Sequence, residues 1–205
     1  RDFRVVLYGQ MALKVQKSTK TICVCYQSTN PMLSFFRSAE VLMVQYAHYH
    51  RDRRNIVTHF VGIPLIFLAI GVLLASPVWP VAGLALTPAW LMWGITSLWY
   101  LSRGHVFLGL ATSVVNGVLM ALAHHLLTLP QPWGMVAWQL GVALFVIGWV
   151  FQFVGHYFEG RKPAFVDDIV GLLVGPMFVV GEAMMALGLL GSLHRAIDRQ
   201  AGPVR

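Results

Sequence analysis

Residues 51–76 read RDRRNIVTHFVGIPLIFLAIGVLLAS, and this stretch decides the class of fold. Three arginines and one aspartate come first, and the rest of the stretch has no Asp, Glu, Lys or Arg. About 20 apolar residues are enough for a helix to cross the hydrocarbon core of a bilayer. Cations beside such a helix mark its cytoplasmic end. The stretch therefore predicts a membrane-spanning helix that begins at the cytoplasmic face.

The rest of the chain follows the same pattern. Charged residues make up 11% of the 205 residues and hydrophobic residues 57%, whereas soluble domains carry about 25% charged residues. No charged residue lies between Arg54 and Arg103, or between Arg103 and Glu159. Each of these gaps has room for two spans. We therefore expect an all-α, polytopic transmembrane helix bundle with about four to five spans.

The expected spans are separated by short segments that contain proline, glycine or serine, which interrupt helices. They cover residues 56–75, 81–101, 106–127, 134–154 and 168–191. In the last of them, Gly175-Pro176 predicts a kink or a re-entrant hairpin. Residues 1–31 are basic and irregular, and we expect a poorly ordered N-terminal extension there; an amphipathic arm is the alternative. Residues 32–205 are expected to form a single transmembrane helical domain.

The net charge of +7 does not point to nucleic acid. The cations flank apolar runs, as the positive-inside rule requires, and no basic face with interleaved aromatic residues is present. Arg103 and the Arg161-Lys162 pair place their loops on the cytoplasmic side with the 51–54 cluster. The sequence leaves open the side of the C-terminus and the oligomeric state.

Eight histidines stand out in so apolar a chain. Ionisable residues at membrane depth are costly, so each is a candidate functional residue. His105 and His194 lie near span ends, where we expect them to reach water. His124 and His125, at the far end of the third expected span, fit the same role.

His50, His59 and His156 form a different group, because the expected topology brings all three to one membrane face. On a single straight helix, His50 and His59 would point in opposite directions at about 3.6 residues per turn. The helix must therefore break between them if they serve one site. Asp52 or Asn55 is suited to cap the helix that follows.

Gln152, His156 and Glu159 are spaced by four and three residues, so one helical face carries all three. Several neutral imidazoles with oxygen ligands suit iron, zinc, copper or nickel better than calcium or magnesium. A hydrogen-bonded polar cluster that holds helices together is an equal alternative. Glu182 lies in the last apolar run without a neighbouring cation in sequence. We expect it either to stay protonated or to meet a partner from another helix, such as a metal-bound histidine.

Three motifs in the correct order cover about residues 40–190. The first is Tyr46-x3-His50-x4-Asn55-x3-His59-x2-Gly62-x-Pro64. The second runs from Phe151 to His156 and continues through Glu159, Arg161, Pro163 and Ala164, and the third comprises Pro176, Phe178 and Glu182. Together they resemble the signature of the membrane 2-hydroxy fatty acid dioxygenases.

The resemblance implies an iron(II)-dependent oxygenase that uses O2 to shorten 2-hydroxy fatty acids by one carbon, as in fatty acid alpha-oxidation. It implies an integral membrane protein of the endoplasmic reticulum or the bacterial inner membrane. The cations beside the expected spans place its active site towards the cytoplasmic face. The implied iron ligands or site residues are His50, His59 and His156. A fourth family histidine falls, by a looser match, at His124 or His125, of which we take His125. The same motifs make candidate catalytic residues of Asn55, Gln152, Glu159 and Glu182.

Two other functions remain open on the sequence. One is a di-iron lipid hydroxylase or desaturase, although that chemistry uses more tightly clustered histidines than this chain has. The other is a transporter or membrane scaffold without catalytic activity. The metal content of the purified protein separates the three, because a scaffold needs no metal and a di-iron enzyme needs two ions per chain.

Overall fold

The computed structural model describes residues 4–8, 11–18, 21–28, 35–131 and 134–205. The chain divides into two compact units, Arg1–Arg37 and Ser38–Arg205. The boundary lies six residues beyond the end of the extension that the sequence predicts (37 − 31 = 6). We describe each unit by itself.

The first unit contains an antiparallel sheet in the order β1 (Arg4–Tyr8), β2 (Met11–Ser18), β3 (Thr21–Ser28). The sequence analysis did not anticipate these strands in the segment that it expects to be poorly ordered. Apolar and polar residues alternate from Leu13 to Gln16 in β2, which is the period of a strand, whereas β3 contains the apolar run Ile22 to Tyr26. Residues 29–31 of that segment lie outside the described residues.

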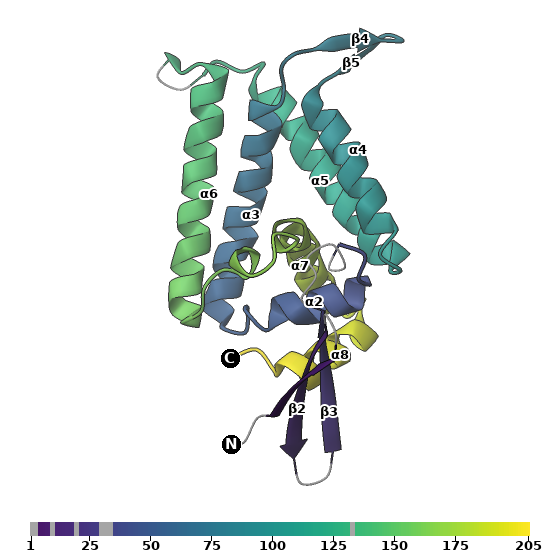
Figure 1. Ribbon diagram of the computed structural model, residues 1–205. Coiled ribbons are helices and arrows are strands. Elements are labelled where there is room, and N and C mark those ends of the chain that lie inside the picture. The colour runs from purple at the N-terminus through teal and green to yellow at the C-terminus, as the bar shows by residue number, and fades with distance from the viewer. Residues whose placement is uncertain (1–3, 9–10, 19–20, 29–34, 132–133) are drawn as a thin grey trace. The chain divides into compact units, whose positions relative to one another are not determined.

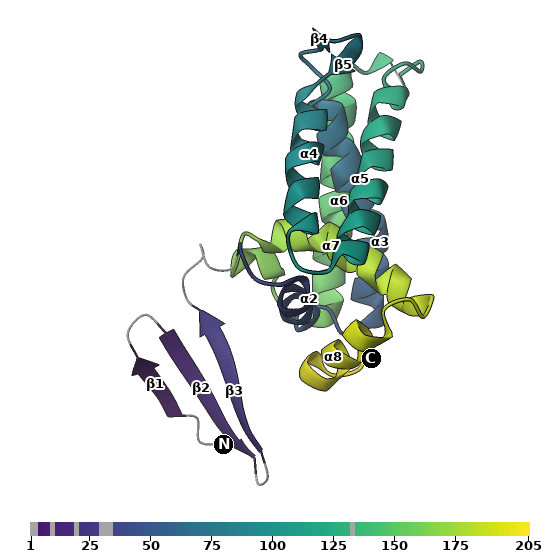
Figure 2. The same cartoon turned by 90° about the vertical axis from the view of Figure 1, so that its right-hand side faces the viewer.

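The second unit is helical, which confirms the expected all-α class. Its elements are α2 (Ala39–Ala47), α3 (Arg53–Leu73), β4 (Trp79–Val81), β5 (Leu84–Leu86), α4 (Pro88–Leu101), α5 (Val106–Leu126), α6 (Ala137–Glu159), the 3-10 helix η2 (Ala164–Val166), α7 (Gly171–Ala186) and α8 (Gly191–Ala201). Helices α3 to α6 run up and down beside one another, and α2, α7 and α8 gather at one end of this bundle (Figures 1 and 2). The start of α3 and the end of α6 lie at that same end (Figure 1).

Three helices among the described residues, α3, α5 and α6, are long and apolar enough to cross a membrane. A fourth span is possible if α7 and α8, which are bent by 112° relative to each other, count as one. Helix α4 has 14 residues and a length of about 21 Å, which is short of the roughly 30 Å hydrocarbon core. It begins only at Pro88 because the preceding residues form the β4–β5 hairpin, so the expected span over residues 81–101 is shortened.

The last apolar run breaks later than the sequence suggests. Helix α7 continues through Gly175-Pro176, where the missing proline N–H removes only one helical hydrogen bond. It ends at Ala186, and Gly188, just beyond the Leu187 cap, has a φ of 77° that favours glycine. Gly188 N donates to Met185 O at 3.0 Å and Leu189 N to Met184 O at 2.9 Å, which is the Schellman pattern of a helix end.

Helices α3 and α6 approach closely because glycines face each other across their contact. A Cβ atom added to Gly62 would lie 2.7 Å from the carbonyl oxygen of Gly148, and one added to Gly155 would overlap Thr58 Oγ1 and Asn55 Oδ1. Small residues allow helix backbones to come together in this way within membranes. This contact brings the first turns of α3 against the last turns of α6, which is where His59 and His156 lie.

Candidate metal centre

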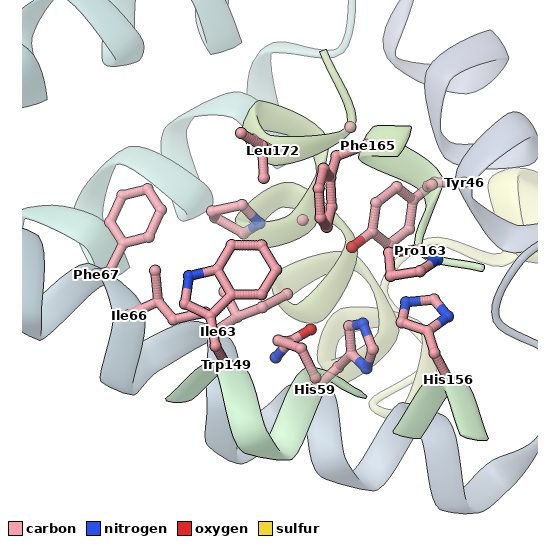
Figure 3. Close-up of a pocket in the computed structure, with 15 residues that line it drawn as sticks. Tyr46, His59, Ile63, Ile66, Phe67, Trp149, His156, Pro163, Phe165 and Leu172 are labelled. Carbon is pink, nitrogen blue, oxygen red and sulfur yellow. The ribbon is translucent and has the colours of Figure 1, made fainter. Parts of the chain in front are cut away.

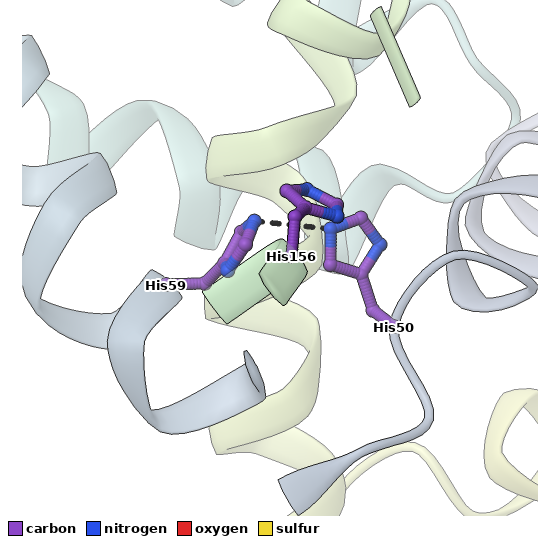
Figure 4. A group of neighbouring side chains, drawn as sticks. All are labelled: His50, His59 and His156. Carbon is purple, nitrogen blue, oxygen red and sulfur yellow. Dashed lines mark hydrogen bonds between the residues drawn. The ribbon is translucent and has the colours of Figure 1, made fainter. Parts of the chain in front are cut away.

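His50, His59 and His156 meet at the end of the bundle where α2, α3 and α6 come together. His50 follows the end of α2, His59 lies in the second turn of α3 and His156 in the last turn of α6. Each offers a ring nitrogen, and these nitrogens all lie within 4.8 Å of one another. The exposed fractions of the three residues are 0%, 1% and 6%. Figure 4 shows the three rings facing one another across a small space.

The backbone sets the tautomers of His50 and His59. His50 Nδ1 lies 2.7 Å from the carbonyl oxygen of Tyr46, and His59 Nδ1 lies 2.9 Å from that of Asn55. A carbonyl oxygen only accepts, so both Nδ1 atoms must carry the proton. In a neutral ring this leaves a lone pair on Nε2. Metal-binding histidines in proteins are held by the same kind of contact.

The two Nε2 atoms lie 3.0 Å apart, so two lone pairs face each other when both rings are neutral. A proton between them would relieve the repulsion, but burial lowers the pKa of His50 well below its ordinary value, and the neighbouring His59 lowers that pKa further. His156 Nδ1 is also buried and has no hydrogen-bond partner among the described residues. A cation bound between the nitrogens would satisfy all three, so the residues fit a metal.

The donor set narrows the choice of metal. Imidazole nitrogens suit iron, zinc, copper and nickel, whereas calcium and magnesium take oxygen ligands. Three protein nitrogens also leave coordination positions for exogenous ligands. No carboxylate joins the three histidines in a group of potential metal ligands among the described residues.

Glu159 is turned away from this nitrogen cluster. Its Oε2 accepts hydrogen bonds from Arg51 N at 2.9 Å, Asp52 N at 2.7 Å and Asn55 Nδ2 at 3.1 Å. Its Oε1 lies 3.3 Å from Arg205 Nη2. The carboxylate therefore ties the end of α6 to the turn that carries His50. In the same turn, Asp52 caps α3 by accepting from Arg54 N at 2.9 Å.

Of the two expectations for Glu182, the structure favours a partner from another segment, and that partner is Arg51 rather than a histidine. Arg51 Nη2 lies 3.4 Å from Glu182 Oε1, and Nη1 donates to the carbonyl oxygen of Gly202 at 3.0 Å. Arg51 itself is buried. The sequence assigned Arg51 only to the cation cluster that sets topology. Its bonds to Glu182 and Gly202 could not be predicted, because these partners lie more than a hundred residues away in sequence.

A cavity of about 60 Å³ opens beside the histidines. His59, His156, Gln152 and Tyr46 contribute its polar lining. Its other lining residues are Ile63, Ile66, Phe67, Trp149, Pro163, Ala164, Phe165, Gly171, Leu172, Gly175 and Pro176. Figure 3 shows Phe67 and Ile66 at the end away from His156 and Tyr46. The cavity thus has a polar end at the nitrogen cluster and an apolar end along α3.

Tyr46 is the residue of this site that sequence reasoning left out of the candidate list. Its ring stacks on that of His50 with centroids 4.1 Å apart and planes 4° apart. Burial raises the pKa of Tyr46 above its ordinary value, so the hydroxyl stays protonated. Its position four residues before His50, at the start of the first motif, was the signal that could have identified it.

His125 is not brought to the other histidines. It lies in the last turn of α5 with His124. A Cβ atom on Gly71 would lie 2.7 Å from the Cβ of Ala123, so this end of α5 packs near the C-terminal end of α3. Gly71 is twelve residues beyond His59, or about 18 Å along the helix. His124 is satisfied there by Thr87 Oγ1 at 3.0 Å and the carbonyl oxygen of Met120 at 2.8 Å.

Comparisons with known proteins bear on the same residues. A family model described as 2-hydroxy-palmitic acid dioxygenase Mpo1-like matches residues 36–187. The 2-hydroxy-palmitic acid dioxygenase MPO1 of Saccharomyces cerevisiae is 30% identical over 155 residues, which cover 75% of this chain and 83% of the yeast protein. No solved structure matches the chain. The matched range of the family model contains the three clustered histidines and every residue that lines the cavity.

Proposed function

Because the chain belongs to the Mpo1-like family of 2-hydroxy-palmitic acid dioxygenases, we propose that it is an iron(II)-dependent dioxygenase that shortens 2-hydroxy fatty acids by one carbon. The observation that carries the proposal is the cluster of three buried histidines whose ring nitrogens lie within 4.8 Å of one another. This cluster borders a largely apolar cavity within a membrane protein.

His50, His59 and His156 would hold the iron through ring nitrogens. Iron(II), when bound, would supply the redox chemistry that the reaction with O2 requires. The backbone carbonyls of Tyr46 and Asn55 keep the Nε2 lone pairs of His50 and His59 directed into the site. Glu159 holds the turn between these two histidines through three hydrogen bonds, which is the supporting role that neighbours of metal ligands have in other proteins.

The cavity suits an amphipathic acid. The carboxylate and 2-hydroxyl of the substrate would lie at the histidine end, and the first carbons of its chain would lie along Ile63, Ile66 and Phe67. A volume of about 60 Å³ is less than the roughly 150 Å³ of an engineered protein cavity that holds benzene. The cavity would therefore hold the reacting end of the substrate, and most of the acyl chain would extend among lipids.

The alternative of a di-iron hydroxylase receives less support. Within the part of the chain that the structure describes, one group of three potential metal ligands is found. The His124–His125 pair lies apart from it, in the last turn of α5. A transporter or scaffold would leave the facing lone pairs of His50 and His59 unexplained. One iron per chain, bound by three histidines, is the arrangement that we propose.

The decisive experiment uses the purified full chain, stripped of metal and reloaded with iron(II) or zinc(II). With iron and O2, 2-hydroxyhexadecanoic acid should yield the fatty acid with one carbon fewer, whereas hexadecanoic acid should not react. Zinc-loaded protein and anaerobic iron-loaded protein should both be inactive. Full activity with zinc would refute the oxygenase, and a stoichiometry of two irons per chain would favour the di-iron enzyme.

A further inference from the structure

The hydroxyl of Tyr46 points into the cavity beside the histidines (Figure 3). The residue is 8% exposed. Its ring packs on His50 and Phe178, and its backbone carbonyl accepts a hydrogen bond from His50. The hydroxyl itself has no hydrogen-bond partner among the described residues. The hydroxyl oxygen is not one of the fully enclosed atoms, so it is open to a ligand in the cavity.

Gln152 presents a second unsatisfied group at the same place. Its side chain lines the cavity and the residue is 5% exposed. The Nε2 atom is buried without a partner among the residues that the structure describes. Tyr46 projects from α2 and Gln152 from α6, so two separate elements bring hydrogen-bond donors without partners to the polar end of one small cavity. The Gln152 amide also borders Gly62 of α3 there.

The ligand that fits two such donors is rich in acceptor atoms. A carboxylate has two acceptor oxygens and is costly to bury without partners. Among the residues that the structure describes, no lysine or arginine lines the cavity. Neutral donors and the proposed metal are therefore the groups available to a buried carboxylate. We infer that the Tyr46 hydroxyl, together with the Gln152 amide, binds the carboxylate of the 2-hydroxy fatty acid beside the histidines. This inference rests on the proposed function.

The structural role of Tyr46 can be separated from this one. Stacking on His50, with centroids 4.1 Å apart, needs only the ring, and the hydrogen bond from His50 Nδ1 goes to the backbone carbonyl. Phenylalanine keeps both contacts. The variant Tyr46→Phe therefore removes the hydroxyl alone, and it should retain the fold and the bound iron.

The test measures binding of radiolabelled 2-hydroxyhexadecanoic acid and its methyl ester to the iron-loaded full chain without O2, so that no turnover occurs. A hydrogen bond to a charged group corresponds to a change of about 10- to 100-fold in affinity, and one to a neutral group to much less. Tyr46→Phe should therefore weaken binding of the acid by about 10-fold or more and that of the ester by only about threefold. The matched control is Tyr157→Phe, because Tyr157 is 82% exposed and lies outside the cavity.

The outcomes separate the inference from the proposed function. If wild-type protein binds the acid and Tyr46→Phe binds it equally well, the inference is wrong and the function stands. If Tyr46→Phe loses iron, the hydroxyl serves the metal site and the inference is also wrong. If wild-type protein neither binds nor converts the acid, the proposed function itself fails. Should Tyr46→Phe not fold, Gln152→Leu provides the same comparison of acid with ester.

Discussion

Glu159 Oε2 lies 2.9 Å from the backbone nitrogen of Arg51, the residue directly after His50. The carboxylate sits at the end of α6, three residues after His156. It therefore couples the positions of two of the three histidines without facing the nitrogen cluster. The chain breaks its helical course between His50 and His59, and this carboxylate satisfies the backbone N–H groups that the break leaves free.

Replacing Glu159 by glutamine should weaken the metal site without abolishing it. The glutamine side chain has one acceptor oxygen in place of two. Its NH2 group would face a donor, either a backbone N–H of the turn or Arg205, where a carboxylate oxygen now accepts. We expect metal affinity to fall by about 10- to 100-fold, the usual cost of losing a group that supports a metal ligand. Titration of the metal-free variant with iron(II) measures this. A complete loss of binding would mean that Glu159 is itself a ligand.

His156→Ala should lose bound iron and oxygenase activity together. Its Nδ1 is buried without a partner, and the proposed site needs its ring nitrogen as a ligand. The control is His194→Ala, because His194 has an exposed side chain and pairs with Asp198 at 3.3 Å; that variant should keep both properties. Iron content per folded chain is the measurement, and a His156→Ala protein that retains iron and activity rules out the site.

Gly155→Ala should destabilise the contact between α3 and α6. Its added methyl group would overlap Thr58 Oγ1 and Asn55 Oδ1, and overpacking of this kind costs about 1–3 kcal/mol. The matched control is Gly94→Ala in α4, where nothing lies within 4 Å of the added Cβ and where helix propensity predicts a gain of up to about 1 kcal/mol. The measurement is the midpoint temperature of thermal unfolding of each variant in detergent. Equal midpoints for Gly155→Ala and Gly94→Ala would show that the α3–α6 contact tolerates the methyl group.

Deletion of residues 1–31 should leave membrane insertion, iron content and activity intact. These residues fall within a compact unit separate from the one that carries the histidines. The measurement is the yield of folded protein and its turnover, relative to the full chain. A truncated protein that does not insert would establish that the segment contributes to folding.

His50, the 103–104 loop and His156 should lie on one side of the membrane. The cations beside them predict that this is the cytoplasmic side. In a variant with Cys23 and Cys25 replaced by serine, single cysteines at Ser102 and Lys162 should react with an impermeant reagent from the same side. A cysteine at Leu84 in β5 should react from the other, because β4 and β5 lie at the opposite end of the bundle (Figure 1). Opposite labelling of Ser102→Cys and Lys162→Cys would refute this topology.

Much of the fold could be read from local pattern. Charge-free stretches and the breakers between them predicted α3, α5 and α6, because helices in lipid satisfy their own backbone and need only apolar side chains. The pattern failed where two local signals compete. Residues 79–86 are as apolar as a span but form a hairpin, and Gly188 ends α7 although Gly175-Pro176 looks like the stronger interruption.

For the site, the sequence by itself determined that His50, His59 and His156 belong together, since topology and motif each select them. Only the tertiary structure decided the direction of each side chain. Glu159 shares a helical face with His156, yet it turns to the backbone of Arg51 because that turn offers it N–H groups. His59 and Gln152 line one cavity because glycines let α3 and α6 approach. Such orientations depend on contacts between residues about a hundred positions apart, which no local period encodes.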